Sequence, residues 1–369
     1  MLSRVLIAGG GTGGHIFPAL AMGKALKAEF PDLELLYVGA LGRMEMEKVP
    51  AAGFRIEGLP IVGVPRRKTP AALCRFVWQW YRSYRMAKRI VSTFNPDVVV
   101  GVGGYASVPA MQAAQRLRIP TLIQEQNSFA GKANRMLAKR AAKVAVAYGG
   151  MERYFPQEKL VLTGNPVREE LLKALPPREE ACAYLGLPAT TTNILVLGGS
   201  LGATRLSEAI LAHASEIGRR SDVTVLLQTG AADFDKMQAL ANAQGASENL
   251  HLVPFIARMD YAYAAADLIV SRAGAIAISE LSLIARPLIL VPSPYVAEDH
   301  QTKNARVLSE VGAAILVPES ESRDGLWHAV EGLLKDEKRR LVMTLSLSHL
   351  AKPSASKDLA QIIASLAKL

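Results

Sequence analysis

The chain has 369 residues, half of them hydrophobic, and a formal net charge of +10. This length predicts two domains with sizeable cores. Two cysteines exclude a disulfide framework, and no apolar run approaches the roughly 20 residues needed to span a bilayer. We expect no signal peptide. The positive charge favours an acidic partner, such as nucleic acid, anionic lipid or a phosphorylated substrate.

The first predicted element is an apolar run at residues 5–8 that ends on a glycine cluster at 9–14. A helical pattern follows, so the stretch predicts a buried parallel strand, a tight turn and a helix. Glycines let the backbone pass close to a ligand, and the amide groups of a helix N-terminus suit an anion. The turn contains Thr12, Gly13, Gly14 and His15.

A basic helix is predicted next, in a segment from Gly58 to Pro96 that contains no acidic residue. At about 100° per residue, we interpret one side as core-facing. That side consists of Leu73, Phe76, Val77, Trp80, Tyr84, Ala87 and Val91. The opposite side carries Arg75, Trp78, Arg82, Arg85 and Arg89. This side is either a solvated basic face or a membrane-surface patch, and the absence of acids favours the membrane.

Two further strands of the first half end in characteristic residues. The strand at 97–102 runs into Gly103 and Gly104, and the strand at 120–124 runs into Glu125 and Asn127. Carboxyl ends of parallel strands are where α/β proteins bind ligands, although both polar residues could instead cap the following helix. An Asn-Pro turn then favours a domain boundary between residues 164 and 165.

The second half begins as the first does, with an apolar run at 193–197 and a glycine turn at 198–202. Two such units predict two doubly wound halves that face one cleft. A later strand at 268–271 enters a small-residue turn and a helix whose N-terminus suits a phosphate. Glu280, one turn into that helix, could accept hydrogen bonds from a ribose diol or be an ordinary helix acid.

Six motifs in order carry a resemblance to a known family. They are residues 10–15, 124–127, 164–168, 198–200, 271–274 and 300–301. The chain resembles, over nearly its full length, the bacterial peptidoglycan glycosyltransferases of family 28 that convert lipid I into lipid II. The resemblance implies the GT-B fold: two Rossmann-like doubly wound α/β domains facing a cleft. It implies domains at 1–164 and 165–345, with a C-terminal helix at 346–369 that packs back on the first domain.

The same resemblance implies an inverting transfer of GlcNAc from UDP-GlcNAc to the MurNAc 4-hydroxyl of lipid I, without a metal or other cofactor. It implies an acceptor domain that associates with an anionic membrane surface, at the cytoplasmic face of the bacterial inner membrane, as a peripheral protein. We expect no nucleic-acid partner.

By motif match, the resemblance also implies roles for individual residues. Ser200 and Arg168 would contact nucleotide or phosphate, Ile256 uracil through its backbone, Glu280 the ribose, and Gln301 the sugar hydroxyls. The start of the helix before Glu280 would complete the donor site, with Gly274, Ala275, Ile276, Ala277, Ile278 and Ser279. Thr12, Gly13, Gly14 and Asn127 would face the cleft from the other domain. The sequence departs from the family's usual residues at Leu201 and Ala277.

Transfer from a UDP-sugar needs a base for the acceptor hydroxyl and stabilisation of the departing UDP. His15 is the candidate base, unless it only hydrogen-bonds the turn backbone. Asn127 and Glu280 are the other catalytic candidates, and Arg168 could pair with the leaving phosphate.

Three alternatives were weighed against this function. A dinucleotide-dependent oxidoreductase needs an acid at the end of the second strand, and none occurs there before Glu45. A basic nucleic-acid-binding protein would leave the glycine turns unexplained. A UDP-sugar epimerase of the same fold needs no lipid acceptor and would leave Trp78 and its arginines without a role.

Overall fold

A computed structural model describes residues 2–63, 65, 69–199 and 202–368. The chain forms two compact units, Met1–Val167 with Lys352–Leu369, and Arg168–Ala351. The first division lies three residues after the predicted one, because Asn165 is buried among groups of the first unit and its Nδ2 donates to the carbonyl of Gln126. The second division lies at 351/352 rather than 345/346, because residues 346–350 complete a helix of the second unit.

The first unit is a parallel sheet of seven strands in the order β3-β2-β1-β4-β5-β6-β7. The strands are β1 (Arg4–Ala8), β2 (Glu34–Ala40), β3 (Arg55–Leu59), β4 (Val98–Gly101), β5 (Thr121–Glu125), β6 (Lys143–Val146) and β7 (Leu160–Leu162). Its helices are α1 (Gly13–Glu29), α2 (Glu45–Ala51), α3 (Pro70–Phe94), α4 (Val108–Arg116), α5 (Lys132–Ala138) and α15 (Ala355–Leu366). Short 3₁₀ turns occur at Tyr105–Ser107, Met151–Arg153 and Gln157–Lys159.

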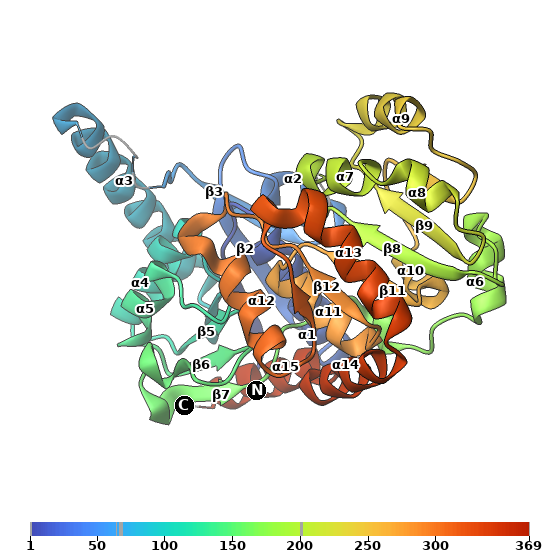
Figure 1. Cartoon of the computed structure of the whole chain (residues 1–369). Helices are drawn as coiled ribbons and strands as arrows, with labels where there is room; N and C mark the ends of the chain where they lie inside the picture. Colours follow the sequence, from blue (N-terminus) through green and yellow to red (C-terminus); the bar gives the residue numbers. More distant parts are fainter. Residues whose placement is uncertain (1, 64, 66–68, 200–201, 369) are drawn as a thin grey trace. The chain divides into compact units, whose positions relative to one another are not determined.

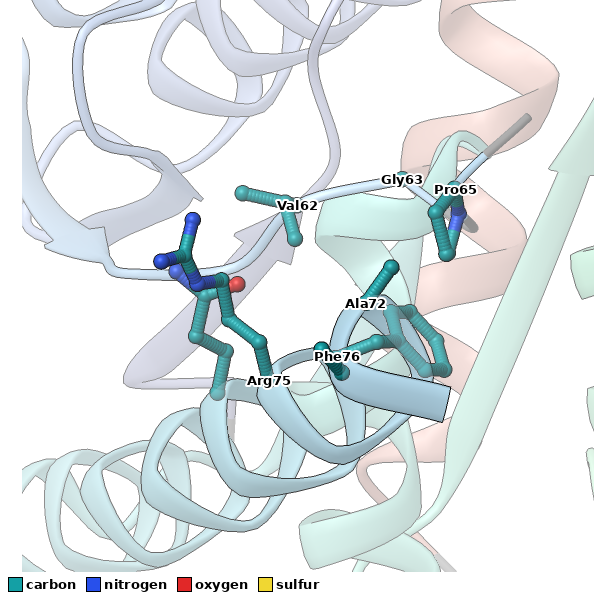
Figure 2. A pocket seen from close by; sticks show the side chains of 8 residues that line it. Val62, Gly63, Pro65, Ala72, Arg75 and Phe76 are labelled. Carbon is teal, nitrogen blue, oxygen red and sulfur yellow. The ribbon is translucent and has the colours of Figure 1, made fainter. Parts of the chain in front are cut away.

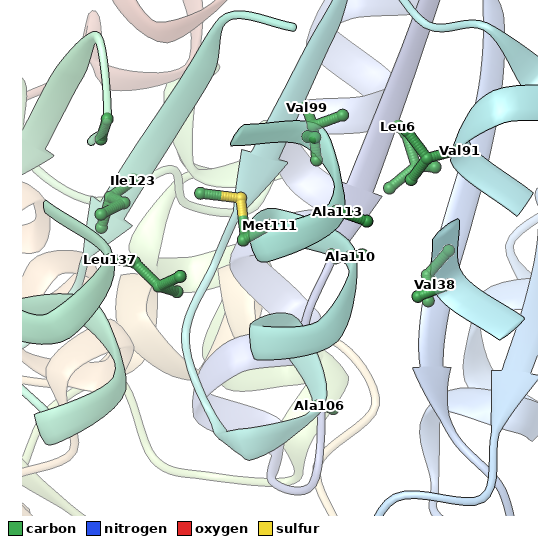
Figure 3. Close-up of a cluster of buried hydrophobic side chains, with 14 of the residues drawn as sticks. Leu6, Val38, Val91, Val99, Ala106, Ala110, Met111, Ala113, Ile123 and Leu137 are labelled. Atoms are coloured by element: carbon green, nitrogen blue, oxygen red, sulfur yellow. The ribbon is translucent and has the colours of Figure 1, made fainter. Parts of the chain in front are cut away.

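Both faces of this sheet are covered, which is why its central strands are apolar throughout. On one face, Leu6 and Val99 of the sheet pack in a cluster with Met111 of α4 and Val91 of α3 (Figure 3). On the other face, Val5 and its neighbours pack with α1 and with α15. The final helix therefore completes the core of the first unit.

Helix α3 begins at Pro70 after Thr69, whose hydroxyl accepts a hydrogen bond from the amide of Ala72. Its buried residues all lie in the second half of the helix, between Ser83 and Val91. The first half extends away from the rest of its unit (Figure 1). The predicted core side is therefore wrong for Leu73 and Val77, which are 40% and 59% exposed because, among the described residues of the first unit, no element packs over them.

The second unit repeats the parallel architecture with six strands in the order β10-β9-β8-β11-β12-β13. The strands are β8 (Thr192–Leu197), β9 (Val223–Gln228), β10 (Leu250–Val253), β11 (Leu268–Ser271), β12 (Leu288–Leu290) and β13 (Ile315–Leu316). Its helices are α6 (Arg178–Leu185), α7 (Thr204–Leu211), α8 (Ala214–Gly218), α9 (Phe234–Ala243), α10 (Met259–Ala265), α11 (Ala275–Ile284), α12 (His300–Glu310), α13 (Ser322–Lys335) and α14 (Glu337–Leu350). Short 3₁₀ turns occur at Glu169–Leu172, Ala297–Asp299 and Glu319–Glu321.

Candidate functional site

Three adjacent strands of the first unit end in glycine-rich or polar loops. β1 leads into residues 9–12, β4 into Gly103 and Gly104, and β5 into residues 126–131. The sheet order reverses between β1 and β4, and doubly wound proteins bind ligands outside the carboxyl ends of strands at such a reversal. The sequence-predicted residues in these loops and the following helix start are Thr12, Gly13, Gly14, His15 and Asn127.

The glycine loop after β1 is held by a buried carboxylate for which the sequence patterns predicted no role. Glu45, 1% exposed, accepts hydrogen bonds from the backbone N–H of Gly11 at 3.1 Å and of Ala40 at 3.0 Å. Gly10 has φ of +149°, and a Cβ added there would lie 2.1 Å from Glu45 Oε1. The amide of Gly11 therefore serves the loop itself and not a ligand anion.

Replacing Glu45 by alanine is expected to lower the free energy of unfolding by about 2–4 kcal/mol, since two backbone amides lose their acceptor. Urea unfolding followed by circular dichroism measures the change. The control is Glu47→Ala on the same helix, an exposed residue for which we expect a change within about 0.5 kcal/mol. Equal stability of the two variants would show that the carboxylate of Glu45 does not hold the loop.

His15, in the first turn of α1, contacts a side chain from a different strand end. Its Nδ1 lies 3.2 Å from Oε1 of Gln126. Gly103, with φ of +94°, leaves room for the imidazole, because a Cβ there would lie 2.9 Å from His15 Cε1. The alternative in which His15 bonds only the turn backbone is therefore wrong, since the loop after β5 supplies a partner.

Glu125, at the end of β5, organises its own loop. Its Oε1 accepts from the backbone amide of Asn127 at 3.1 Å and from Asn127 Nδ2 at 3.3 Å. Its Oε2 accepts from the amide of Gly131 at 3.0 Å and from Asn134 Nδ2 at 2.9 Å. Glu125 therefore holds the loop before α5 instead of capping that helix, and it orients the side chain of Asn127.

In the second unit, the strand order reverses between β8 and β11. The loops after β8, β11 and β12 are thus neighbours, and the amide of Arg272 donates to the carbonyl of Leu197 across the reversal. Gln301, beyond β12, accepts from the amide of Ser293 at 2.9 Å, which fixes its side chain against the loop. Ile256 follows the edge strand β10 and is buried. Ser200 and Leu201 lie outside the described residues.

Arg168 and Glu280, predicted separately from the sequence, form one ion pair. Arg168 Nε donates to Glu280 Oε1 at 2.7 Å, and Nη2 donates to Oε2 at 3.0 Å. The buried hydroxyl of Tyr263 donates to Glu280 Oε2 at 3.3 Å. Burial alone would lower the pKa of Arg168, but the charge and hydrogen bonds of Glu280 raise it. Neither Tyr263 nor this pairing has a signal in the neighbouring sequence.

The N-terminus of α11 is formed by Gly274, which precedes its first turn with extended backbone. The hydroxyl of Ser279 donates to the carbonyl of Ala275 at 3.0 Å, and the side chain of Ile278 is buried. The first-turn amides point out of the helix end, where the dipole favours negative charge. This end of α11 is suited to an anion through its backbone.

Both units match families of known proteins. The family model of the Glycosyltransferase family 28 N-terminal domain matches residues 5–146, and that of the C-terminal domain matches residues 193–361. The chain belongs to glycosyltransferase family 28. One relative, from Bacteroides fragilis, is 45% identical over 99% of this chain and 96% of its own length. It is named UDP-N-acetylglucosamine–N-acetylmuramyl-(pentapeptide) pyrophosphoryl-undecaprenol N-acetylglucosamine transferase.

Solved structures agree with membership of glycosyltransferase family 28. The crystal structure of MurG of Acinetobacter baumannii has a TM-score of 0.78 and 29% identity, and the match covers 98% of this chain and 99% of that one. The predicted GT-B architecture of two doubly wound α/β units is confirmed. A UDP-N-acetylglucosamine 2-epimerase, at 15% identity and a TM-score of 0.66 over 97% of this chain and 94% of that one, shares the fold alone.

In this member of glycosyltransferase family 28, the first half of α3 is exposed on several sides. Trp78 and Tyr81 are 59% and 52% exposed. The guanidinium of Arg82 lies 5.4 Å from the ring centre of Trp78, and that of Arg85 lies 6.0 Å from the ring centre of Tyr81. Arg75 and Arg89 are exposed as well. Aromatic and cationic groups therefore share one surface.

A pocket of about 410 Å³ lies beside the first turns of α3. Figure 2 shows Val62, Gly63 and Pro65 on one side of it and residues of α3, including Arg75 and Phe76, on the other. The ring of Tyr105 lies within van der Waals reach of a side chain built at either Gly11 or Gly63. This tyrosine therefore connects the edge of the pocket with the glycine loop.

Within the described residues, no group of three or more His, Cys, Asp or Glu side chains is placed to hold a metal ion. No described helix is both long and apolar enough to cross a bilayer.

Proposed function

We propose that the chain transfers GlcNAc from UDP-GlcNAc to the MurNAc 4-hydroxyl of lipid I, forming lipid II with inversion at the anomeric carbon. The observation that carries the proposal is the 45% identity to a relative named for this transfer, which extends over both units. An epimerase resembles the chain only in fold, at 15% identity.

A radiolabelled donor assay tests the proposal. Purified protein with UDP-[¹⁴C]GlcNAc and a lipid I analogue is expected to transfer label to the lipid fraction and release UDP in equal amount. Consumption of UDP-GlcNAc without the acceptor, with label appearing in an epimeric sugar, would support the epimerase instead.

On the acceptor side, His15 is the proposed base. Its Nε2 would remove the proton of the sugar hydroxyl while the oxygen attacks the anomeric carbon of GlcNAc. The bond from that carbon to the β-phosphate breaks, and UDP leaves with the electron pair. Thr12, Gly13, Gly14 and Asn127 would line this side of the reaction, with Asn127 oriented by Glu125.

On the donor side, the pair of Arg168 and Glu280 is proposed to act as a unit. A carboxylate has about four lone-pair sites, and Glu280 already accepts two hydrogen bonds from Arg168 and one from Tyr263, so one site is left for a ribose hydroxyl. The side chain of Arg168 is 50% exposed and can face the leaving phosphate.

The rest of the donor site is proposed from the neighbouring loops. Amides at the start of α11 would bind phosphate, together with the loop that contains Ser200. The backbone of Ile256 would contact uracil, and Gln301 the sugar hydroxyls.

We further propose that α3 is the membrane contact and that the protein works at the cytoplasmic face of the inner membrane as a peripheral protein. Trp78 and Tyr81 are exposed beside arginines, and amphipathic rings with cations suit the interface of an anionic bilayer. Each basic residue near such a surface contributes about 1 kcal/mol. A polyprenyl-linked acceptor would be reached from this surface.

The purified protein is expected to sediment with anionic vesicles, much less with neutral ones, and to be partly released by high salt. Trp78→Glu combined with Arg82→Glu should abolish this binding, because an acidic pair replaces the indole and its cation. Turnover of a short-chain, water-soluble acceptor should persist.

The matched control is Tyr184→Glu with Arg258→Glu, an exposed aromatic and an arginine of the second unit, which should leave vesicle binding intact. If the α3 variant binds vesicles as well as the unmodified protein does, this face of α3 is only solvated. Loss of activity on the soluble acceptor would assign α3 to the fold or to the acceptor pocket.

A further inference from the structure

We propose that Gln126 is a positioning residue that holds the imidazole of His15 in the Nδ1–H tautomer, which leaves the lone pair on Nε2. The proposal rests on the proposed function only in what that lone pair does, since the tautomer itself is a property of the free protein.

The contact that carries the proposal joins the first turn of α1 to the loop after β5. His15 Nδ1 lies 3.2 Å from Gln126 Oε1. An amide oxygen only accepts hydrogen bonds, so a neutral imidazole facing it must carry its proton on Nδ1. The inference therefore depends on which end of the Gln126 amide faces the histidine.

A backbone carbonyl fixes that orientation. Gln126 Nε2 donates to the carbonyl of Val102 at 2.7 Å and lies 3.2 Å from the carbonyl of Gln124. A reversed amide would place its oxygen against these two carbonyl oxygens, and Gln126 is only 1% exposed, so no solvent would relieve the repulsion.

A second, independent anchor gives the same orientation. Asn165 Nδ2 donates to the carbonyl of Gln126 at 3.1 Å, so Oδ1 of Asn165 faces Gln124 and accepts from its Nε2 at 2.9 Å. Oε1 of Gln124 is then left to accept from Nε2 of Gln126. All three amides are buried. The chain of amides thus ends with an oxygen directed at His15.

This arrangement matters for proton transfer. With the proton on Nδ1, Nε2 can take the proton of the acceptor hydroxyl. The resulting imidazolium carries protons on both nitrogens and keeps its Nδ1–H bond to Gln126, so that hydrogen bond is unchanged through the step. A glutamine holds the ring without adding a negative charge beside the imidazole.

The test is a long-range ¹H–¹⁵N correlation spectrum of the ¹⁵N-histidine-labelled protein. A pH of about 8.5, roughly two units above the ordinary histidine pKa, keeps exposed imidazoles neutral. The chain has six histidines, and the signals of His15 are those that vanish in His15→Ala. We expect the coupling pattern of an Nδ1–H imidazole in the unmodified protein.

Gln126→Met keeps the side-chain length and removes the acceptor. The coupling pattern of the His15 imidazole should therefore change toward that of the Nε2–H tautomer. kcat should fall about tenfold, with KM for UDP-GlcNAc changed less than about twofold. Gln126→Glu retains an acceptor and should retain Nδ1–H. The control is Gln115→Met, which removes another inward amide bonded to Leu137 O and should leave the His15 signals unchanged.

An Nε2–H pattern in the unmodified protein, or an Nδ1–H pattern that persists in Gln126→Met, would overturn the proposal. A different result would contradict the proposed role of His15 as the base. Normal turnover in His15→Ala would remove the base role while the tautomer measurement stood.

Discussion

Replacing His15 by alanine is expected to lower kcat about a hundredfold or more while UDP affinity stays nearly unchanged. General-base catalysis typically contributes 10²–10⁴-fold, and a hundredfold loss corresponds to about 2.7 kcal/mol in the activation barrier. The imidazole contacts the Gln126 amide and lies against Gly103, within the first unit. Steady-state kinetics at saturating acceptor, with calorimetric titration of UDP, measures both quantities.

The control is His328→Ala, an exposed histidine on α13, which should leave kcat and UDP binding unchanged. Lost UDP binding in His15→Ala, with normal turnover at saturating donor, would assign His15 to donor binding. The base would then lie elsewhere.

Glu280→Ala is expected to raise KM for UDP-GlcNAc by roughly ten- to a hundredfold, since a hydrogen bond to a charged group contributes about 1.5–3 kcal/mol. Two causes are combined in this variant: the ribose loses its acceptor, and Arg168 loses the partner that holds two of its nitrogens. The control is Glu208→Ala, which removes a surface ion pair with Lys236 and should change KM little.

A 2′-deoxyribose donor separates the two causes. If Glu280 binds the ribose, the unmodified enzyme should lose affinity for this donor, and Glu280→Ala should show little further loss. If the 2′-deoxyribose donor loses the same fold of affinity in the unmodified enzyme and in Glu280→Ala, Glu280 acts only by holding Arg168. Unchanged KM and kcat in Glu280→Ala would remove Glu280 from the donor site altogether.

The strands that position the site could be predicted because buried parallel strands are continuous apolar runs. The run before Gly9 and the run before Gly198 became β1 and β8, and the loops at their ends flank the reversals of the two sheets. Glycine after an apolar run is a local signal, so the position of both turns followed from neighbouring residues alone.

The remaining features depend on groups far apart in the chain. Arg168 and Glu280 are 112 residues apart, and nothing in either neighbourhood predicts that they pair. For α3, the apolar periodicity gave a correct inward side at Tyr84 and Ala87 but not at Leu73. The periodicity shows which side of the helix is apolar. How much of that side is buried depends on how far the sheet extends beneath the helix.

The return of the chain to the first unit at Lys352 has a consequence for biosynthesis. The second unit is one uninterrupted stretch, whereas the first is assembled from two stretches separated by 184 residues. α15 supplies Leu359 and Ile363 to the core that α1 shares. While the ribosome is still making residues 168–351, the part of this core that α15 covers is still exposed. The first unit is therefore completed only after the second has been synthesised, and the nascent chain must keep that surface from aggregating until α15 emerges.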